Sequence, residues 1–325
     1  MEVDDALIVD RYLGSIIGAA VGDSLGAGYE FTDPAPDDKI EMCGGGPFNW
    51  APGEWTDDTQ MTIAILTSLA AGNFSSVGVA EKFIEWYESM PPDIGTQTRM
   101  VLGSTTNPDE LHVMAAAFLD ANPGSAGNGA LMRTSPIALI ERKERGKIAD
   151  FASEIAALTH CHKDSINACI LWSLAIQEAV NSDVDDDNFD WINTIRNGLV
   201  FLDLEDRGRW EKLIEETEKK NPTEFNPNGW VVTAFQAALS AINQASFDNK
   251  EPSSHFKESL ISAIRIGNDT DTVASIAGAY LGARWGKSAI PDEWVNAIHG
   301  YRIFGGELLN AGTLEDLVIS TLKGQ

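Results

Sequence analysis

The sequence is poor in basic side chains, in cysteine and in long apolar runs. Its 325 residues include 23 Lys and Arg against 49 Asp and Glu, which gives a formal net charge of −26. Proteins that bind a phosphate backbone need clustered basic side chains to release counterions, so nucleic acid is disfavoured as a partner. A surface this acidic would also be repelled by anionic lipid, which disfavours a membrane partner.

Cysteine is scarce and lacks paired spacing. Cys43, Cys161 and Cys169 are an odd number, so no disulfide framework is expected and a reducing compartment is favoured. Residues 1–5 are acidic and lack the positive start of a signal peptide. No stretch reaches the roughly 18 uninterrupted apolar residues of a spanning helix. We therefore expect a cytoplasmic protein, and we expect a monomer.

Apolar residues recur with helical spacing along most of the chain. The hydrophobic fraction is 43%, and a chain of this length can bury roughly three quarters of the surface that it exposes when unfolded. Alternating strand-like runs bounded by hairpin turns are scarce, so we predict an all-α protein. The predicted helices cover residues 13–25, 59–71, 79–90, 148–158, 166–180, 231–242, 256–266, 273–281 and 293–304.

The first of these helices carries a stripe of glycines. Gly14, Gly18, Gly22 and Gly26 recur every four residues. Each glycine in a helix is unfavourable by about 1 kcal/mol relative to alanine, so four in register need a compensating contact. Asp23 interrupts the apolar run and argues against a membrane dimer motif. The stripe predicts very close packing against another helix.

One stretch of the chain differs in character from the rest. Residues 181–190 are acidic and rich in asparagine, and residues 204–228 are highly charged. Apolar helices of the same kind resume on both sides. We therefore interpret residues 181–228 as a variable insertion of surface loops and a solvated helix within one domain that spans residues 1–325.

Two short segments place carboxylates and hydroxyls at the start of a helix. They are Trp-Thr-Asp-Asp-Thr-Gln at 55–60 and Gly-Asn-Asp-Thr-Asp-Thr at 267–272. Helix capping explains either segment alone, because such side chains accept unpaired backbone N–H groups and match the helix dipole. Asp57 and Gln60 even resemble a capping box.

Taken together, the two segments hold more carboxylates than capping needs. If both helix starts converge, each pair of carboxylates near 4 Å repels by about 4 kcal/mol at an effective dielectric constant of about 20. Bound cations would resolve that conflict. Carboxylate and hydroxyl oxygens favour Mg²⁺ or Mn²⁺ over Zn²⁺, and the number of carboxylates implies two ions.

Two known metal-binding patterns fail on these residues. An EF-hand that begins at Asp269 would need Gly at Ala274 and Glu at Tyr280. All-α terpene synthases carry two acidic motifs that are partly matched here, but Met61 replaces the last Asp of the first motif and Ile276 replaces the Glu of the second.

Three further features have both a functional and an ordinary explanation. The glycine-rich loop at 124–130, followed by Arg133, could approach a phosphate, although a plain turn before a helix explains it as well. His160 is too close in sequence to His162 for a closed zinc site, which favours a helix-end histidine. Asp93 directly follows two prolines and could cap the next helix.

In this order, the motifs resemble the ADP-ribosylglycohydrolase family. The match runs from G-D-x-L-G with Glu30, through W-T-D-D-T, D-I-G-x-x-T, G-N-G-A-x-M-R, L-T-H and G-W-V-V, to G-N-D-T-D-T, and it covers residues 11–285. The paired acidic segments with G-N-G-A-x-M-R between them make a specific signature. Members of the family include the hydrolase that reactivates ADP-ribosylated dinitrogenase reductase.

The resemblance implies a single compact orthogonal multi-helix bundle with a binuclear Mg²⁺ or Mn²⁺ site at converging helix N-termini. It places Glu30 beside the metals on a gating loop, and it makes Asp58 and Asp93 the remaining catalytic carboxylates. The implied metal ligands are Thr56, Asp57, Asp58, Asp269, Asp271 and Thr272. The implied ADP-ribose contacts are Gly127, Asn128, Gly129, Met132 and His160, and Trp230 either stacks on a base or a departing group or serves packing alone.

The implied activity is removal of ADP-ribose from a modified protein side chain, with arginine the first expectation for the acceptor. Cleavage at C1″ passes through an oxocarbenium-like state that nearby anions stabilise, and a water helped by Asp58 or Asp93 would attack. The alternatives are a magnesium-dependent all-α pyrophosphate enzyme (a terpene synthase or a nucleotide pyrophosphohydrolase), a non-catalytic ADP-ribose-binding relative, and a helical protein whose capped helices form no site.

Overall fold

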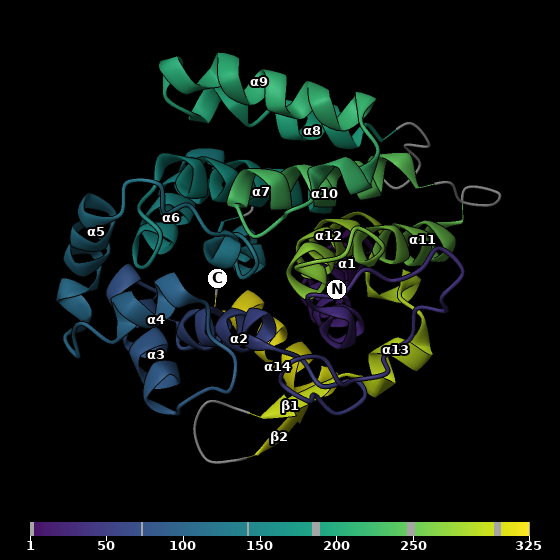
Figure 1. The fold of residues 1–325 in the computed structure, drawn as a ribbon, viewed down its shortest axis with the longest axis horizontal. Coiled ribbons are helices and arrows are strands. Elements are labelled where there is room, and N and C mark those ends of the chain that lie inside the picture. Colours follow the sequence, from purple (N-terminus) through teal and green to yellow (C-terminus); the bar gives the residue numbers. More distant parts are fainter. Residues whose placement is uncertain are drawn as a thin grey trace.

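The computed structural model describes residues 3–72, 74–141, 143–183, 189–245, 251–301 and 307–324. In these residues the chain is mostly helical, with loops and one small sheet, and the predicted all-α fold is confirmed. Helices α1 (Val3–Gly26) and α12 (Thr270–Trp285) lie side by side at the centre, and the other helices surround them (Figure 1). A segment near the start of the chain is thereby packed against one near its end.

The remaining elements follow in chain order. The helices of the first half are α2 (Asp57–Ala70), α3 (Ser76–Glu88), α4 (Thr96–Leu102), α5 (Leu111–Ala121), α6 (Arg145–Ala157) and α7 (Lys163–Asn181). Those of the second half are α8 (Trp191–Arg196), α9 (Leu204–Lys219), α10 (Val231–Gln244), α11 (Pro252–Ile264), α13 (Asp292–Ala297) and α14 (Ala311–Lys323). Strands β1 (His299–Tyr301) and β2 (Leu308–Asn310) form a small antiparallel sheet.

The glycine stripe of α1 packs directly on the backbone of α12, as the spacing predicts. A Cβ atom on any of these glycines would overlap α12 main-chain atoms, so no larger residue fits without a shift of the helices. The contacting pairs are Gly14 with Gly282, Gly18 with Gly278, and Gly22 with Ala274. This contact brings the carboxyl end of α1 to the amino end of α12, where Thr270 Oγ1 donates a hydrogen bond to Gly26 O (2.9 Å).

The predicted helix at 293–304 is wrong beyond its first turns. Helix α13 ends at Ala297, and the chain continues as β1. There His299 N donates to Gly53 O (2.9 Å) and His299 O accepts from Trp55 N (3.0 Å), so pairing with the loop before α2 extends the backbone. Phe304, at the end of the predicted helix, lies outside the described residues.

The charged stretch 181–228 contributes to the core as well as to the surface. Helix α8 buries Trp191 and Ile195, and α9 buries Trp210 and Ile214. The other face of α9 is solvated, as expected. Of the acidic part at 181–190, residues 184–188 lie outside the described residues.

No helix in the described part of the chain has both the length and the apolar character needed to cross a membrane.

Candidate active site

The two acidic helix starts meet. Helix α2 begins at Asp57 and α12 begins at Thr270. Thr272 Oγ1 donates a hydrogen bond to Asp58 Oδ2 at 3.3 Å, although the two residues are 214 positions apart in the sequence. Thr56 Oγ1 lies 3.4 Å from the same carboxylate oxygen. The predicted convergence of these segments is therefore present in the fold.

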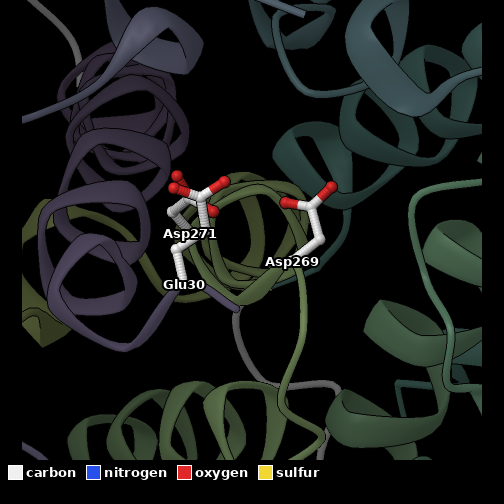
Figure 2. A group of neighbouring side chains, drawn as sticks. All are labelled: Glu30, Asp269 and Asp271. Atoms are coloured by element: carbon white, nitrogen blue, oxygen red, sulfur yellow. The ribbon is translucent and has the colours of Figure 1, made fainter. Parts of the chain in front are cut away.

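A third segment adds a carboxylate to the same place. Glu30 directly follows the short helical turn after α1. One carboxylate oxygen from each of Glu30, Asp269 and Asp271 lies within 4.8 Å of the others. Figure 2 shows the three side chains gathered over the end of one helix, with the carboxylates of Glu30 and Asp271 overlapping in the view. Such a group of oxygen donors could hold a metal ion.

Capping does not account for these carboxylates. The N-cap residue of α2 is Thr56, and Asp57 is the first residue of the helix. The prediction that Asp57 and Gln60 form a capping box is wrong, because Gln60 Oε1 instead accepts a hydrogen bond from Trp86 Nε1 (2.8 Å). Asp269, at the N-cap of α12, makes no side-chain capping bond. The acidic side chains therefore remain available for a ligand.

Unpaired oxygens show that the site fits a cation. Glu30 Oε2, Asp58 Oδ1 and Asp271 Oδ1 are buried and have no hydrogen-bond partner among the described residues. An ionised carboxylate can only accept hydrogen bonds, and a buried acceptor without a partner is costly. A divalent ion with oxygen ligands would satisfy all three, and the neighbouring threonine hydroxyls suit the same hard ions.

Burial and mutual repulsion disfavour the ionised carboxylates in the absence of such an ion. Burial is the main cause that raises the pKa of Asp57, Asp58 and Asp271 well above the ordinary range, and neighbouring carboxylates add to it. Burial, followed by the charge of Asp269, raises the pKa of Glu30 to about 8. A bound cation would reverse these shifts by favouring the ionised forms.

The carboxylates border a cavity of about 420 Å³. Most residues that the sequence motifs single out line it: Glu30, Asp57, Asp93, Gly127, Asn128, Gly129, Met132, His160, Asp269, Asp271 and Thr272. Thr56 and Asp58 are buried and are not among the lining residues, and the side chain of Trp230 is 43% exposed and also outside the lining. A slightly larger cavity beside α7 and α8, about 500 Å³, contains none of these residues.

Asp93 does not cap the next helix. The N-cap of α4 is Gly95, which offers no side-chain capping bond. Asp93 instead lines the cavity. Burial, followed by the charge of Glu30, raises the pKa of Asp93 to about 7. A carboxyl group with a pKa near neutrality is suited to accept a proton during a reaction.

Two buried polar residues were given no role by the sequence motifs. Asp23, on α1, accepts hydrogen bonds from Thr56 N (3.0 Å) and from Thr59 N (3.0 Å) and Oγ1 (2.5 Å), and so anchors the start of α2. Asn228 Oδ1 accepts from Asp269 N (3.0 Å), while Asn128 Nδ2 donates to Asp269 Oδ2 (2.7 Å). For Asp23 and Asn228, the only signal in the sequence was a single polar side chain, within a motif of small residues in the first case and within a loop motif in the second.

The lining also contains residues to which the sequence analysis gave no role, although Thr98 is the last residue of the D-I-G-x-x-T motif. Phe31 and Phe48 border the cavity with exposed aromatic rings, and Gln97 and Thr98 line it from the start of α4.

Comparison with known proteins agrees with this geometry. A family model described as ADP-ribosylglycohydrolase matches residues 4–323. The chain is 30% identical to the ADP-ribosylarginine hydrolase Tri1 of Serratia proteamaculans over 297 residues, which cover 89% of this chain and 75% of that protein. It is 29% identical to the ADP-ribosyl-[dinitrogen reductase] glycohydrolase of Rhodospirillum rubrum, with 89% and 90% of the two chains covered.

A solved structure is also similar. It is titled an ADP-ribosylglycohydrolase-related protein complex, is 26% identical in sequence, and superposes with a TM-score of 0.76 over 98% of this chain and 99% of that one. The family model covers nearly all of the chain, and the predicted resemblance and the predicted enzyme class are both confirmed. This protein belongs to the ADP-ribosylglycohydrolase family.

Proposed function

We propose that this protein hydrolyses the C1″ N-glycosidic bond between ADP-ribose and a modified arginine side chain. The observation that carries the proposal is the meeting of Glu30 with the two acidic helix starts at the wall of one cavity. The choice of arginine is supported by the relatives from Serratia proteamaculans and Pseudomonas putida, which are named as ADP-ribosylarginine hydrolases.

The residues that would hold the metal come from the two helix starts. Thr56, Asp57 and Asp58 would bind from α2, and Asp269, Asp271 and Thr272 would bind from α12. Two Mg²⁺ or Mn²⁺ ions suit this number of oxygen donors. When bound, the ions would supply positive charge that orients the ribose hydroxyls and acidifies water.

The protein's own side chains would perform the remaining steps. Asp93 would accept the proton of the attacking water, because its raised pKa matches that task at neutral pH. Asp58 and Glu30 would place negative charge near C1″, where positive charge develops as the bond to the guanidinium nitrogen breaks. Asn128, Met132 and His160, with the glycines at 127 and 129, would position the ADP-ribose, and Trp230 would contact it from the rim.

A release assay tests this proposal. Proteins carrying ADP-ribose on arginine or on serine would be incubated with wild type, Asp93→Asn and Asp271→Asn, with and without a chelator. We expect release from arginine, loss of release with the chelator, and a decrease of at least about a hundredfold for either variant. Full release of ADP-ribose in the presence of the chelator would contradict the proposal. So would a protein that hydrolyses prenyl diphosphates or nucleoside triphosphates but releases no ADP-ribose.

We also propose that the protein acts as a cytoplasmic monomer. Three free cysteines and the acidic composition support a reducing compartment and a soluble surface. Light scattering coupled to gel filtration would report the mass of the particle, and a dimer mass would overturn the monomer.

A further inference from the structure

An unusual buried charge lies behind the cavity wall. The side chain of Arg133, the residue after Met132, is completely buried. Its guanidinium carbon lies 4.3 Å from the ring centroid of Phe83, and Nη1 lies 3.3 Å from Met61 Sδ. No carboxylate in the described part of the chain forms an ion pair with it. Burial lowers the pKa of Arg133 to about 10, so the group stays charged at neutral pH.

Arg133 begins a short chain of hydrogen bonds. Its Nη2 donates to Thr159 Oγ1 at 2.7 Å, and Thr159 Oγ1 lies 2.8 Å from His160 Nδ1. Thr159 and His160 are both buried. The chain therefore connects a buried cation to a residue that lines the cavity.

The direction of these bonds fixes the protonation of His160. A guanidinium only donates, and a threonine hydroxyl has a single hydrogen to donate. Within the described residues that hydroxyl has no acceptor other than His160 Nδ1, so it would be buried and unsatisfied if Nδ1 carried a proton. The satisfied arrangement leaves Nδ1 as the acceptor and places the ring hydrogen on Nε2.

The Nε2 end of the ring faces the glycine-rich loop and the cavity. A Cβ atom on Gly129 would lie 3.2 Å from Nε2, and one on Gly127 would lie 3.5 Å from it. No hydrogen bond to Nε2 occurs among the described residues, so its N–H is available to a ligand. Burial, and secondly the charge of Arg133, lowers the pKa of His160 to about 3, which keeps the ring neutral.

Among the described residues, the side chains that line the cavity offer no positive charge to an anion. None of the described residues that line it is Lys or Arg, and five of them are Asp or Glu. The diphosphate of ADP-ribose is nevertheless anionic. A buried charge is screened far less by salt than an exposed one, so the guanidinium of Arg133 acts through the wall on a ligand in the cavity.

We propose that Arg133 and Thr159 are positioning residues that hold His160 as the neutral Nε2–H tautomer, aimed at a phosphate oxygen of the substrate, and that the unpaired charge of Arg133 supports binding of the diphosphate. The ligand in this statement rests on the proposed function. The tautomer does not, because it is a property of the free protein.

Nuclear magnetic resonance of ring-labelled histidine tests the tautomer without any ligand. The chain has five histidines, and His160→Asn assigns the signal. In wild type, the ring nitrogen and carbon shifts of His160 should be those of the Nε2–H tautomer at pH 7. Thr159→Ser should keep that signature, and Thr159→Val should lose it. An Nδ1–H tautomer or an imidazolium in wild type would overturn the inference.

Calorimetric titration tests the effect on binding. Thr159→Val should weaken ADP-ribose binding by roughly tenfold, whereas Thr159→Ser, which keeps the hydroxyl, should bind ADP-ribose as tightly as wild type does. Arg133→Met should weaken ADP-ribose binding by the same factor of roughly ten as Thr159→Val, and it should leave Mn²⁺ binding unchanged. Thr217→Val is the control, because it removes an equally buried hydroxyl from α9, where Thr217 Oγ1 donates to Ile214 O (2.7 Å). This variant should change neither the ADP-ribose affinity nor the Mn²⁺ affinity.

The outcomes separate this inference from the proposed function. The positioning role would be overturned if Thr159→Val bound ADP-ribose as tightly as wild type does. It would also be overturned if Thr159→Ser bound ADP-ribose as weakly as Thr159→Val does. The threonine variants decide this even if Arg133→Met does not fold. A wild-type protein that binds no ADP-ribose would contradict the proposed function and the ligand named here, whatever tautomer His160 shows.

Discussion

Asp23 is a single buried carboxylate that anchors the start of α2, where three of the proposed metal ligands lie. It lies on α1, is fully buried, and accepts hydrogen bonds from three donor groups of Thr56 and Thr59, which flank Asp57 and Asp58. Ligands of a metal site depend on such supporting partners for their orientation. The carboxylates of α2 therefore owe their positions to α1.

Replacing Asp23 with Asn should damage both the fold and the site. If the Asn oxygen takes the place of Oδ2, the NH₂ group takes the place of Oδ1 and faces the backbone N–H of Thr56, so we expect a loss of roughly 1–3 kcal/mol in the free energy of unfolding. Mn²⁺ affinity should fall as well. Urea unfolding and Mn²⁺ titration would measure the two effects, with the exposed Asp150→Asn as control. Unchanged Mn²⁺ affinity in the Asp23 variant would contradict its supporting role.

The sequence revealed the acidic residues of the site but not their supports. Asp57, Asp58, Asp269 and Asp271 stand out because neighbouring carboxylates at a helix start exceed what capping needs. Asp23 does not stand out, because its partner Thr56 is 33 positions away and only the fold brings the two together. The role of Asn228 was hidden for the same reason.

At the scale of elements, the contact of α1 with α12 sets the geometry of the site. The glycines of α1 let the two backbones approach until no Cβ atom fits between them. Glu30 follows α1, and Asp271 lies in the first turn of α12, so the spacing of these helices determines the distance between the two carboxylates.

A methyl group in this contact should disturb the distant site. Gly18→Ala would overlap the carbonyl oxygen of Gly278, and overpacking of this kind costs about 1–3 kcal/mol of stability. We also expect weaker Mn²⁺ binding. Gly208→Ala is the matched control, since no atom lies within 4 Å of its Cβ position in α9. That variant should gain up to about 1 kcal/mol from helix propensity.

Thermal unfolding and Mn²⁺ titration of the two alanine variants would decide the matter. A Gly18→Ala protein as stable as wild type would show that the helices can separate at little cost.

Length alone did not decide which elements were predicted, because α5 and α14, with 11 and 13 residues, were missed along with the shortest helices. Helices with several turns of apolar spacing, such as α7 and α10, were predicted within a few residues. Helices α4 and α8 have only seven and six residues, too few for periodicity to register. Strand β1 was taken for helix because its extended form depends on pairing with residues 53–55, which no local pattern contains.

At the scale of the whole molecule, we propose that residues 1–325 form one domain. Helix α1 packs on both α12 and α14, so the two ends of the chain share one core. Calorimetry should therefore show a single unfolding transition. Two resolved transitions would indicate separate domains, with residues 181–228 the first candidate for the second unit.

Crowded carboxylates should make the metal-free protein less stable as the pH rises. Burial is the main cause that raises the pKa values of Asp23, Asp93 and Glu30, to about 6, 7 and 8 respectively. The folded protein then binds more protons than the unfolded chain does. Its extra stability is complete below the ordinary carboxyl pKa near 4 and is lost as the pH rises through the raised values.

Melting curves with a chelator should thus show a falling Tm between about pH 5 and pH 8. Saturating Mg²⁺ should reduce the fall, because a bound cation favours the ionised carboxylates. A metal-free Tm that rises over this interval would contradict the account of the site.

The most direct test of the account is the location of Mn²⁺ by anomalous diffraction from crystals grown with Mn²⁺ and ADP-ribose. We predict two anomalous peaks within ligand distance of the carboxylates of Asp57, Asp58, Asp269 and Asp271, with the distal ribose of ADP-ribose beside them. Peaks confined to other surfaces, with the cavity holding ADP-ribose but no Mn²⁺, would contradict the claim that these helix starts form the catalytic metal centre.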